Sequence, residues 1–434
     1  MKKLTLITLA FSLLFVAELS ASNKRFETRT ATIKRDVSPN DLINIKAKNT
    51  DLVVESWDKN EVEITATVRF DGKMTDKMVS FLDNFQEYVE DNVEFSGGEL
   101  RIKTNLDEPN KIQIGSKHIG IVIGFSEDEF KLDYKIKAPA INKFEIDNSY
   151  KDVSLIGDFQ HIKLTQYSGE LTADFIEKAE LNMKYGSAKL KGMGSAVLEI
   201  YEQKLEVESI EQLEIDTKYS EIDVVKLKTM ETASYESDFV LGKAEEITGN
   251  FKYGEMEIKN NLDRAEFDFY EMDIEANSAG TIEFKSSKYG KISFDQVSKL
   301  TFDQSYEDEL TIGELGLFRS IDSKYGNHEI DNLTGSFELN AYEDDIHIRE
   351  VDHAVNSIEL KGKYLNTTLG ISNRSFNLQA DVKYGKFDYD KQEIEMKKYI
   401  KDGDKLEIEA LSKTKTADAI SISIEGYEID VVIN

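Results

Sequence analysis

The sequence predicts an all-β protein, and more specifically a β-solenoid built from short internal repeats of about 18 residues. Fourteen tyrosines between positions 150 and 384 recur at a nearly constant spacing, which sets the length of the repeat. The apolar residues between them alternate at period two, which is typical of strands with one buried face. No helical period separates these strands, and the units are too short for βαβ layers or for a four-stranded propeller blade. A solenoid is the remaining architecture.

The N-terminus has the residue order of a secretory signal peptide. Lys2 and Lys3 precede the apolar residues 4–17, and small residues follow at 20–22. This order of charge, hydrophobe and small residues predicts a signal peptide over residues 1–22, with a buried N-terminal helix as the alternative. Without cysteine the chain has no site for lipidation at a signal-peptide Cys. We therefore expect export to the periplasm, cell surface or medium without a lipid anchor.

Composition excludes several classes of protein. The chain has 83 Asp and Glu against 54 Lys and Arg, a formal net charge of −29. Such acidity argues against nucleic acid and anionic lipid as partners. The absence of cysteine excludes disulfides, thiolate metal sites and thiol catalysis. Beyond the N-terminus no apolar run approaches the roughly 18 residues of a membrane span, so we expect none in the mature chain.

Residues 23–145 are predicted to form an N-terminal β-rich region with one helix near 74–90. Thr75 or Asp76 can cap the helix start, and apolar residues recur every three or four positions after it. We expect this helix to cover the open end of the solenoid, with a functional lid as the alternative. The expected strands are 42–48, 52–56, 62–70, 100–104, 111–114, 119–125 and 130–136.

Residues 146–390 hold the repeats, in two alternating classes. In the Lys-Tyr-Gly class, as at Tyr185, apolar residues follow the tyrosine at +3, +5 and +8. In the Tyr-Glu class, as at Tyr201, they follow at +4, +6 and +9. We expect the rings to stack as a ladder with the ring body inside and the hydroxyl at the rim, and glycine to supply positive φ at a corner. The residues predicted to point inward include Ile222, Val224, Ile292, Phe294, Leu310 and Ile312.

The sequence leaves open whether one coil contains one repeat unit or a pair of units, which is about 18 or about 35 residues. A coil of two units would stack the glutamates of the Tyr-Glu class about 4.8 Å apart, which is unfavourable unless cations neutralise them. A coil of one unit avoids this repulsion, and we favour it, but it gives no reason for the pairing of the two classes. Residues 391–434 depart from the spacing, and we expect them to finish or cap the coil.

Candidate chemistry is sparse, and we identify no catalytic or cofactor-binding residue. The five histidines, at 118, 161, 328, 347 and 353, lack a metal-binding spacing, and His328 occupies an inward +3 position. Two acidic clusters repeat at one position of the unit, which makes calcium the one cofactor considered. The interpretation that we prefer is a solvated turn that discourages aggregation, with no bound cofactor. The candidate metal ligands are Glu307, Asp308, Glu309, Glu343, Asp344 and Asp345.

Three stretches carry a resemblance to a known family. They are LINIKAKNTDLVVESWDKNEVEITATV, KAPAINKFEIDNSYKDVSLIGDF and the recurring KYG followed by alternating apolar residues. These resemble the exported putative-adhesin β-strand-repeat family of bacteria, a domain of unknown function, although the family's Gly-Asp step lacks its glycine at 49–51 and 150–152. The resemblance implies a β-solenoid outside the cytoplasm and no established catalytic residues, so no site is carried over.

These observations favour an exported non-enzymatic scaffold or adhesin-like protein. Its partner would be an extracellular or envelope protein or glycan, bound on a long regular sheet. The first alternative is a polysaccharide-active β-helix enzyme, which would gather carboxylates once on one sheet. The second is an envelope sensor that acts through a partner.

Overall fold

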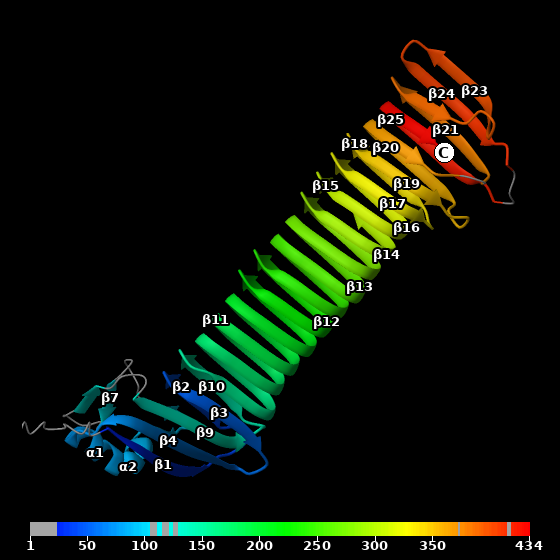
Figure 1. Ribbon diagram of the computed structural model, residues 1–434. Coiled ribbons are helices and arrows are strands. Elements are labelled where there is room, and N and C mark those ends of the chain that lie inside the picture. Colours follow the sequence, from blue (N-terminus) through cyan, green and yellow to red (C-terminus); the bar gives the residue numbers. More distant parts are fainter. Residues whose placement is uncertain (1–23, 105–110, 115–120, 125–128, 372–373, 415–417) are drawn as a thin grey trace, which may run out of the picture.

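The computed structural model describes residues 24–104, 111–114, 121–124, 129–371, 374–414 and 418–434. The predicted signal peptide lies outside them. Strands make up most of the described chain and two short helices lie near its N-terminal end, so the all-β prediction is confirmed. Figure 1 shows a long, nearly straight rod of stacked coils with additional strands at both ends. In the described residues, neither helix is long and apolar enough to cross a membrane.

The N-terminal end consists of strands that flank the two helices. Thr75 caps the first helix by accepting a hydrogen bond from the Met78 amide, as the sequence predicts. The single helix expected near 74–90 is divided at Asn84, whose side-chain amide donates to the Ser80 carbonyl. The elements are β1 (Lys24–Asp36), β2 (Leu42–Lys48), β3 (Asp51–Trp57), β4 (Glu61–Lys73), α1 (Asp76–Asp83), α2 (Phe85–Asp91), β5 (Val93–Ser96), β6 (Glu99–Lys103), β7 (Lys111–Ile114), β8 (Ile121–Gly124), β9 (Phe130–Pro139) and β10 (Lys143–Ser149).

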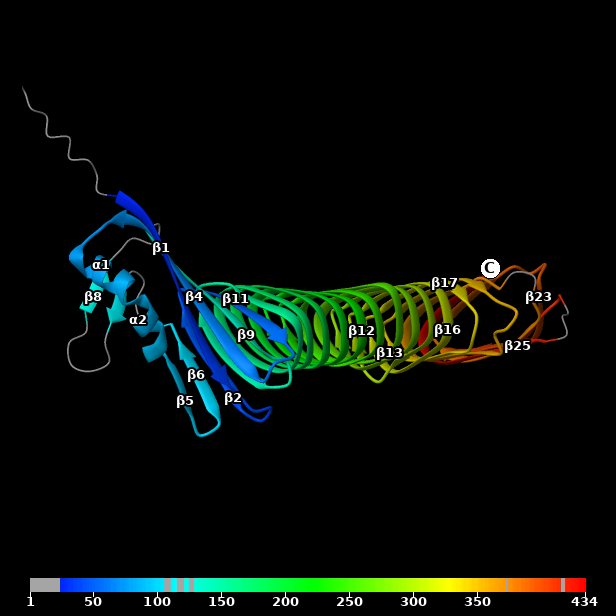
Figure 2. The same cartoon turned by 90° about the horizontal axis from the view of Figure 1, so that it is seen from below.

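β2 and β3 form the first coil, and further strands extend its sheet edges. β6 pairs with β2 and β9 pairs with β3, both in parallel. β5 then joins β6, and β4 and β1 extend the sheet from β9, all antiparallel. The helices bury their apolar face at this end, where the rings of Phe81 and Phe130 lie 6.1 Å apart. The backbone edges of the first coil are thus met by strands, while the helices pack beside them (Figure 2).

The rod itself is a stack of coils, and each coil is as long as one repeat unit. Lys204 pairs with Glu221 in parallel, and Lys291 pairs with Glu309. Since the paired positions are a single unit apart in the sequence, one unit makes one coil. The strands of the stack are β11 (Val153–Lys218), β12 (Glu221–Tyr235), β13 (Asp238–Lys288), β14 (Lys291–Phe302), β15 (Ser305–Tyr306), β16 (Glu309–Lys324), β17 (Asn327–Leu333), β18 (Phe337–Tyr342), β19 (Asp345–Val351) and β20 (Ser357–Leu369).

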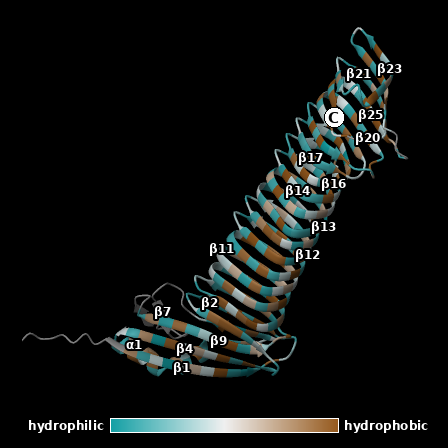
Figure 3. Cartoon of the chain, turned by 45° about the vertical axis from the view of Figure 1, so that its right-hand side comes forward, coloured by the Kyte–Doolittle hydropathy of each residue, from teal (hydrophilic) through white to brown (hydrophobic). Residues whose placement is uncertain are grey.

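The interior of the stack is filled by the inward apolar residues. Alternation buries every second side chain along the strands, and Figure 3 shows the resulting hydrophobic and hydrophilic bands. Stacked phenylalanines add a second regular feature, with 4.6 Å between the ring centroids of Phe318 and Phe337. The inward assignment is confirmed, because at most 2% of each of the six predicted residues is exposed: Ile222, Val224, Ile292, Phe294, Leu310 and Ile312.

At the C-terminal end the order in space departs from the order in sequence. The last strand, β25, pairs in parallel with β20 on one side and with β21 and β22 on the other. Residues 420–433 therefore lie inside the stack, and an antiparallel sheet of β21, β24 and β23 follows. The elements are β21 (Phe376–Lys383), β22 (Lys386–Tyr389), β23 (Ile394–Asp402), β24 (Lys405–Ser412) and β25 (Ile420–Ile433).

Candidate functional site

One corner of every coil turns through a single residue in the left-handed backbone conformation. The amide of this residue donates to a carbonyl of the neighbouring coil, as from Tyr219 to Tyr235 (3.0 Å) and from Glu236 to Lys252 (2.8 Å). The conformation costs an L-residue other than glycine about 1 to 2 kcal/mol. The residues concerned are Asn49, Tyr150, Ser168, Tyr185, Glu202, Tyr219, Glu236, Tyr253, Glu271, Tyr289, Glu307, Tyr325, Glu343, Tyr364, Tyr384 and Glu428.

The tyrosines form a continuous ladder along this corner, which we call the tyrosine corner. Neighbouring ring centroids lie 5.2 to 5.7 Å apart, and the rings are inclined by 64° to 80°, an edge-to-face arrangement. In spatial order the ladder contains Tyr150, Tyr167, Tyr185, Tyr201, Tyr219, Tyr235, Tyr253, Tyr270, Tyr289, Tyr306, Tyr325, Tyr342, Tyr364, Tyr427 and Tyr384.

The rings lie outside the coil, so the expectation of a ring body inside is wrong. Tyr219, Tyr289 and Tyr325 are 43%, 40% and 42% exposed. The interior of the corner is occupied instead by the residue after the left-handed one, as Ser220 (4%) and Ser237 (1%) show. The ladder is therefore an aromatic surface available to a partner.

The left-handed residue explains why the two classes of repeat alternate. In the Lys-Tyr-Gly class it is the tyrosine itself, as at Tyr289, whereas in the Tyr-Glu class it is the following glutamate, as at Glu307. When coils are aligned on this residue, the offsets of the inward residues become identical. In one coil the ring belongs to the left-handed residue, and in the next coil it belongs to the residue before the left-handed one. This offset of one position sets neighbouring rings edge to face, a geometry that aromatic pairs prefer to a face-to-face sandwich. The two-coil period is the period of the ladder.

The glycine after the tyrosine is needed mainly for close approach. Tyr185 carries the positive φ of its corner, while a Cβ on Gly186 would lie 2.2 Å from the Gly169 carbonyl oxygen of the preceding coil. The expectation of positive φ at this glycine holds at Gly254 (φ 138°). At Gly186 and Gly290 the tyrosine takes that role.

Exposed glutamates accompany every second ring of the corner. A hydrogen bond to the Glu202 carboxylate raises the pKa of Tyr201, because it stabilises the neutral phenol. Glu307 raises the pKa of Tyr306 in the same way. These glutamates are separated by a coil whose left-handed residue is tyrosine, so they lie about 10 Å apart, twice the strand spacing. The glutamates are Glu202, Glu236, Glu271, Glu307, Glu343 and Glu428.

The acidic candidate ligands are divided between two sides of the strand. Glu307, Glu309, Glu343 and Asp345 are exposed, whereas Asp308 (2% exposed) and Asp344 (0%) point inward. The prediction of a solvated turn is therefore wrong for these two aspartates, because strand alternation turns the middle residue of each cluster into the core. Among the described residues, no three His, Cys, Asp or Glu side chains converge as metal ligands.

The two buried aspartates join successive coils. Asp308 accepts hydrogen bonds from the Ser287 and Ser305 hydroxyls (2.5 and 2.6 Å) and from the Gly290 amide (2.9 Å). Burial raises the pKa of Asp308, and these hydrogen bonds oppose the rise.

Asp344 and His328 form the corresponding contacts in later coils. Asp344 accepts from the Ser323 hydroxyl and the Gly326 amide, and its other neighbour is the His328 Nε2 atom at 3.0 Å. His328 is 2% exposed, as its inward position predicts. This pair is closed to solvent, so we assign it to the core. Of the other histidines, His161 contacts Glu180, His347 and His353 are exposed, and His118 lies outside the described residues.

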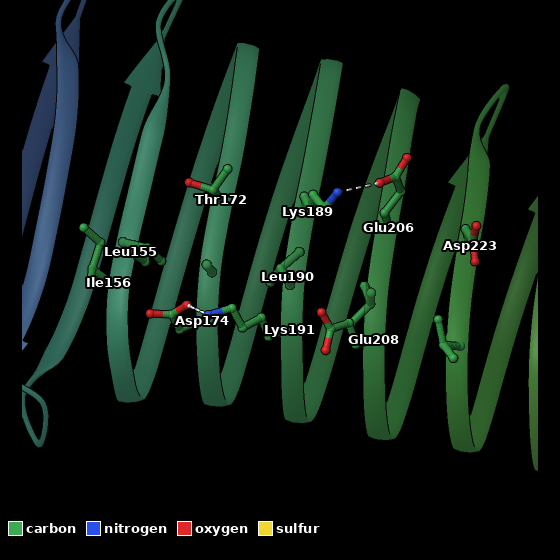
Figure 4. Close-up of a pocket in the computed structure, with 13 residues that line it drawn as sticks. Leu155, Ile156, Thr172, Asp174, Lys189, Leu190, Lys191, Glu206, Glu208 and Asp223 are labelled. Atoms are coloured by element: carbon green, nitrogen blue, oxygen red, sulfur yellow. Dashed lines mark ion pairs between the residues drawn. The ribbon is translucent and has the colours of Figure 1, made fainter.

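A shallow groove of about 460 Å³ lies on a sheet face near the start of the stack (Figure 4). Ion pairs cross it between coils, from Lys191 to Asp174 (2.6 Å) and from Lys189 to Glu206 (3.6 Å). These two pairs neutralise part of the lining, whereas Glu208 and Asp223 leave it with a net negative charge. The groove is confined to the first coils of the stack, whereas the tyrosines continue along it from Tyr150 to Tyr384. The tyrosine corner is the stronger candidate surface.

Comparison with known proteins gives similar structures only. No family model matches the chain, and no curated protein matches it. A putative adhesin from Parabacteroides merdae is 14% identical over 63% of this chain and 97% of its own, with a TM-score of 0.32. A putative cell adhesion protein from Clostridium sporogenes is 8% identical, with coverage of 94% and 100% and a TM-score of 0.18.

A further solved structure, a putative lipid binding protein from Parabacteroides distasonis, is 14% identical over 69% of this chain and 98% of its own, with a TM-score of 0.27. The chain is thus similar, at low identity, to solved bacterial proteins described as putative adhesins. The function proposed below is argued from the residues of the tyrosine corner.

Proposed function

We propose that this chain is an exported, non-enzymatic β-solenoid scaffold with an adhesin-like role, and that the tyrosine corner binds an envelope or extracellular component. One observation carries the proposal. The ladder keeps its rings on the outside of the rod although each corner carries a backbone penalty of about 1 to 2 kcal/mol. Glycine would relieve that penalty, whereas tyrosine and glutamate retain a regular amphipathic edge. Tyrosine is favoured in binding surfaces because it offers a rigid apolar body with a polar end.

The proposed organisation follows the predicted boundaries. Residues 1–22 are the signal peptide, 23–145 form the N-terminal region, 146–390 carry the repeats, and 391–434 complete the C-terminal end. The helix pair, with β6 and β9, would cap the first coil. Caps of this kind prevent the edges of a repeat stack from joining another chain.

A non-enzymatic role is supported by the position of the carboxylates. Asp308 and Asp344 are in the core with hydroxyl and amide partners, so substrate has no contact with them. The exposed glutamates of the corner repeat at every second coil. A glycosidase instead needs one local pair of carboxyl groups placed around a single bond.

Binding of the purified mature chain to isolated cell-envelope particles tests the proposal. We expect wild-type protein to be depleted from solution and the triple variant Tyr219→Ala, Tyr289→Ala, Tyr325→Ala to bind at least about tenfold more weakly. The matched control is Val225→Ala, a residue 53% exposed on a sheet face. Equal binding by the triple variant would refute the role of the corner, and release of reducing sugar would favour the enzyme alternative.

A further inference from the structure

The rings of the tyrosine corner are not equally exposed, and the more exposed ones recur at every second coil for most of its length. Between 185 and 364, five rings whose tyrosine is itself the left-handed residue are 38% to 43% exposed: Tyr185, Tyr219, Tyr289, Tyr325 and Tyr364. The rings between them are half-buried, and Tyr253 interrupts the series. The accessible surface therefore has a two-coil period, like the ladder itself.

Two coils correspond to about 10 Å along the rod, since neighbouring strands are about 4.8 Å apart. An extended β-1,4-linked polysaccharide repeats over a disaccharide of similar length. Its successive sugars are turned over, so every second sugar presents the same face to one side. A ligand of this kind would place equivalent sugars on equivalent rings along the nearly straight rod (Figure 1).

The side chains of the corner fit the two surfaces of such a sugar. A pyranose with equatorial substituents has an apolar C–H face, which can pack on an aromatic ring, and hydroxyls at its rim. The exposed Glu236, Glu271 and Glu307 would accept hydrogen bonds from those hydroxyls. Each glutamate sits at a left-handed position that glycine would occupy at lower cost, which indicates that the carboxylate is useful there.

Charge restricts the ligand further. The chain has a formal net charge of −29, and a row of carboxylates lies beside the rings. An anionic polysaccharide would be repelled by this edge. A neutral or cationic polymer would not be.

We propose that the tyrosine corner binds an extended neutral or cationic β-1,4-linked polysaccharide lying parallel to the rod, with one disaccharide for every two coils. This inference rests on the proposed function of the corner as the binding surface. Because the contacts repeat, affinity grows with the number of disaccharides engaged, as in other multivalent binding.

Calorimetry on the wild-type mature chain tests the ligand class without any variant. The probes are β-1,4-linked glucose and N-acetylglucosamine oligomers of increasing length, with α-1,4-linked glucose oligomers and an alginate as controls. We expect binding to the β-1,4-linked glucose and N-acetylglucosamine oligomers, with affinity rising at least about tenfold from two to six sugars, and no binding to the α-1,4-linked oligomers or to the anionic alginate. Equal binding of the α-1,4-linked oligomers, or an affinity independent of length, would overturn the proposal.

Variants then locate the site. Tyr289→Ala with Tyr325→Ala should weaken binding of the longest oligomer at least about tenfold, because two rings of one period are lost. The corresponding Phe variants keep the rings and should bind within about threefold of wild type. Tyr399→Ala is the matched control, since Tyr399 is 53% exposed in β23 outside the ladder. Unchanged binding by the double Ala variant would refute the site.

The failures of the two proposals are distinguishable. If the corner variants lose binding to envelope particles but no β-1,4-linked oligomer binds, the ligand class is wrong and the proposed function stands. If the variants bind envelope particles like wild type, both proposals fail.

Discussion

Replacing Ile312 by alanine should cost the stack about 2 to 5 kcal/mol. Ile312 is 1% exposed and lies in register between Phe294 and Ile330 of the neighbouring coils. The change removes three carbon groups, worth about 2.4 kcal/mol at about 0.8 kcal/mol each. The cavity left between two coils adds to this loss, because the rigid stack can close only in part.

The matched control is Glu307→Ala, a nearby position in the same coil. Glu307 is exposed, so its removal should cost less than about 1 kcal/mol, the usual range for a surface charge. Urea unfolding followed by far-ultraviolet circular dichroism measures both losses as changes in midpoint at constant m. Equal losses, or a larger loss for Glu307→Ala, would refute the assignment of faces.

Three further predictions follow from the same structure. Burial raises the pKa of Asp308 above its ordinary 3.8, so its contribution to stability is largest below that pH and falls as the pH rises through the folded pKa. Relative to Asp308→Asn, wild type should therefore lose thermal stability as the pH rises above about 4, and a constant difference in Tm would contradict this. Calcium at about a millimolar should raise Tm by less than about 5 °C, and a larger rise that magnesium does not reproduce would establish ion sites at 307–309 and 343–345. Deleting residues 420–434 removes β25 from between β20 and β21, so amide exchange should accelerate over 376–412 but not over 221–302; unchanged protection over 376–412 would disprove that dependence.

Much of the fold was predictable because strand alternation and a constant repeat length are visible in the sequence. Ile222 and Phe294 could be assigned to the core from parity alone. The coil length also followed correctly from the repulsion of stacked glutamates, since the strand registers pair positions that are a single repeat unit apart.

The orientation of the tyrosines was not predictable from the same parity. In a regular strand, residues at even offsets share a face and residues at odd offsets do not. The inward residues at +3 and +5 after Tyr185 therefore predict that its ring lies outside. The inward residues at +4 and +6 after Tyr201 predict that its ring lies inside. A left-handed residue after Tyr201 removes the conflict by changing the strand direction, and no pattern of hydrophobicity encodes it. The conflict in parity was itself a signal of an irregular corner.

Neither the burial of Asp308 nor the pairing of β25 could be predicted from local sequence, because both depend on contacts with other coils. An aspartate between two glutamates is typical of a solvated turn, and its partners Ser287 and Gly290 belong to the coil before. Likewise β25 follows β24 in sequence but pairs with β20, and its Tyr427 continues the ladder between Tyr364 and Tyr384. Both contacts depend on stacking, which local sequence does not specify.

A distance between two spin labels tests the stacked tyrosine corner most directly. The chain contains no cysteine, so Glu236→Cys with Glu343→Cys gives one specifically labelled pair that leaves every tyrosine in place. Six ladder steps separate Tyr235 from Tyr342, so the structure predicts a separation of about 29 Å at about 4.8 Å per coil, broadened by the label linkers. A narrow distribution near about 14 Å, the value for coils of twice this length, would contradict one tyrosine per coil and with it the continuous ladder.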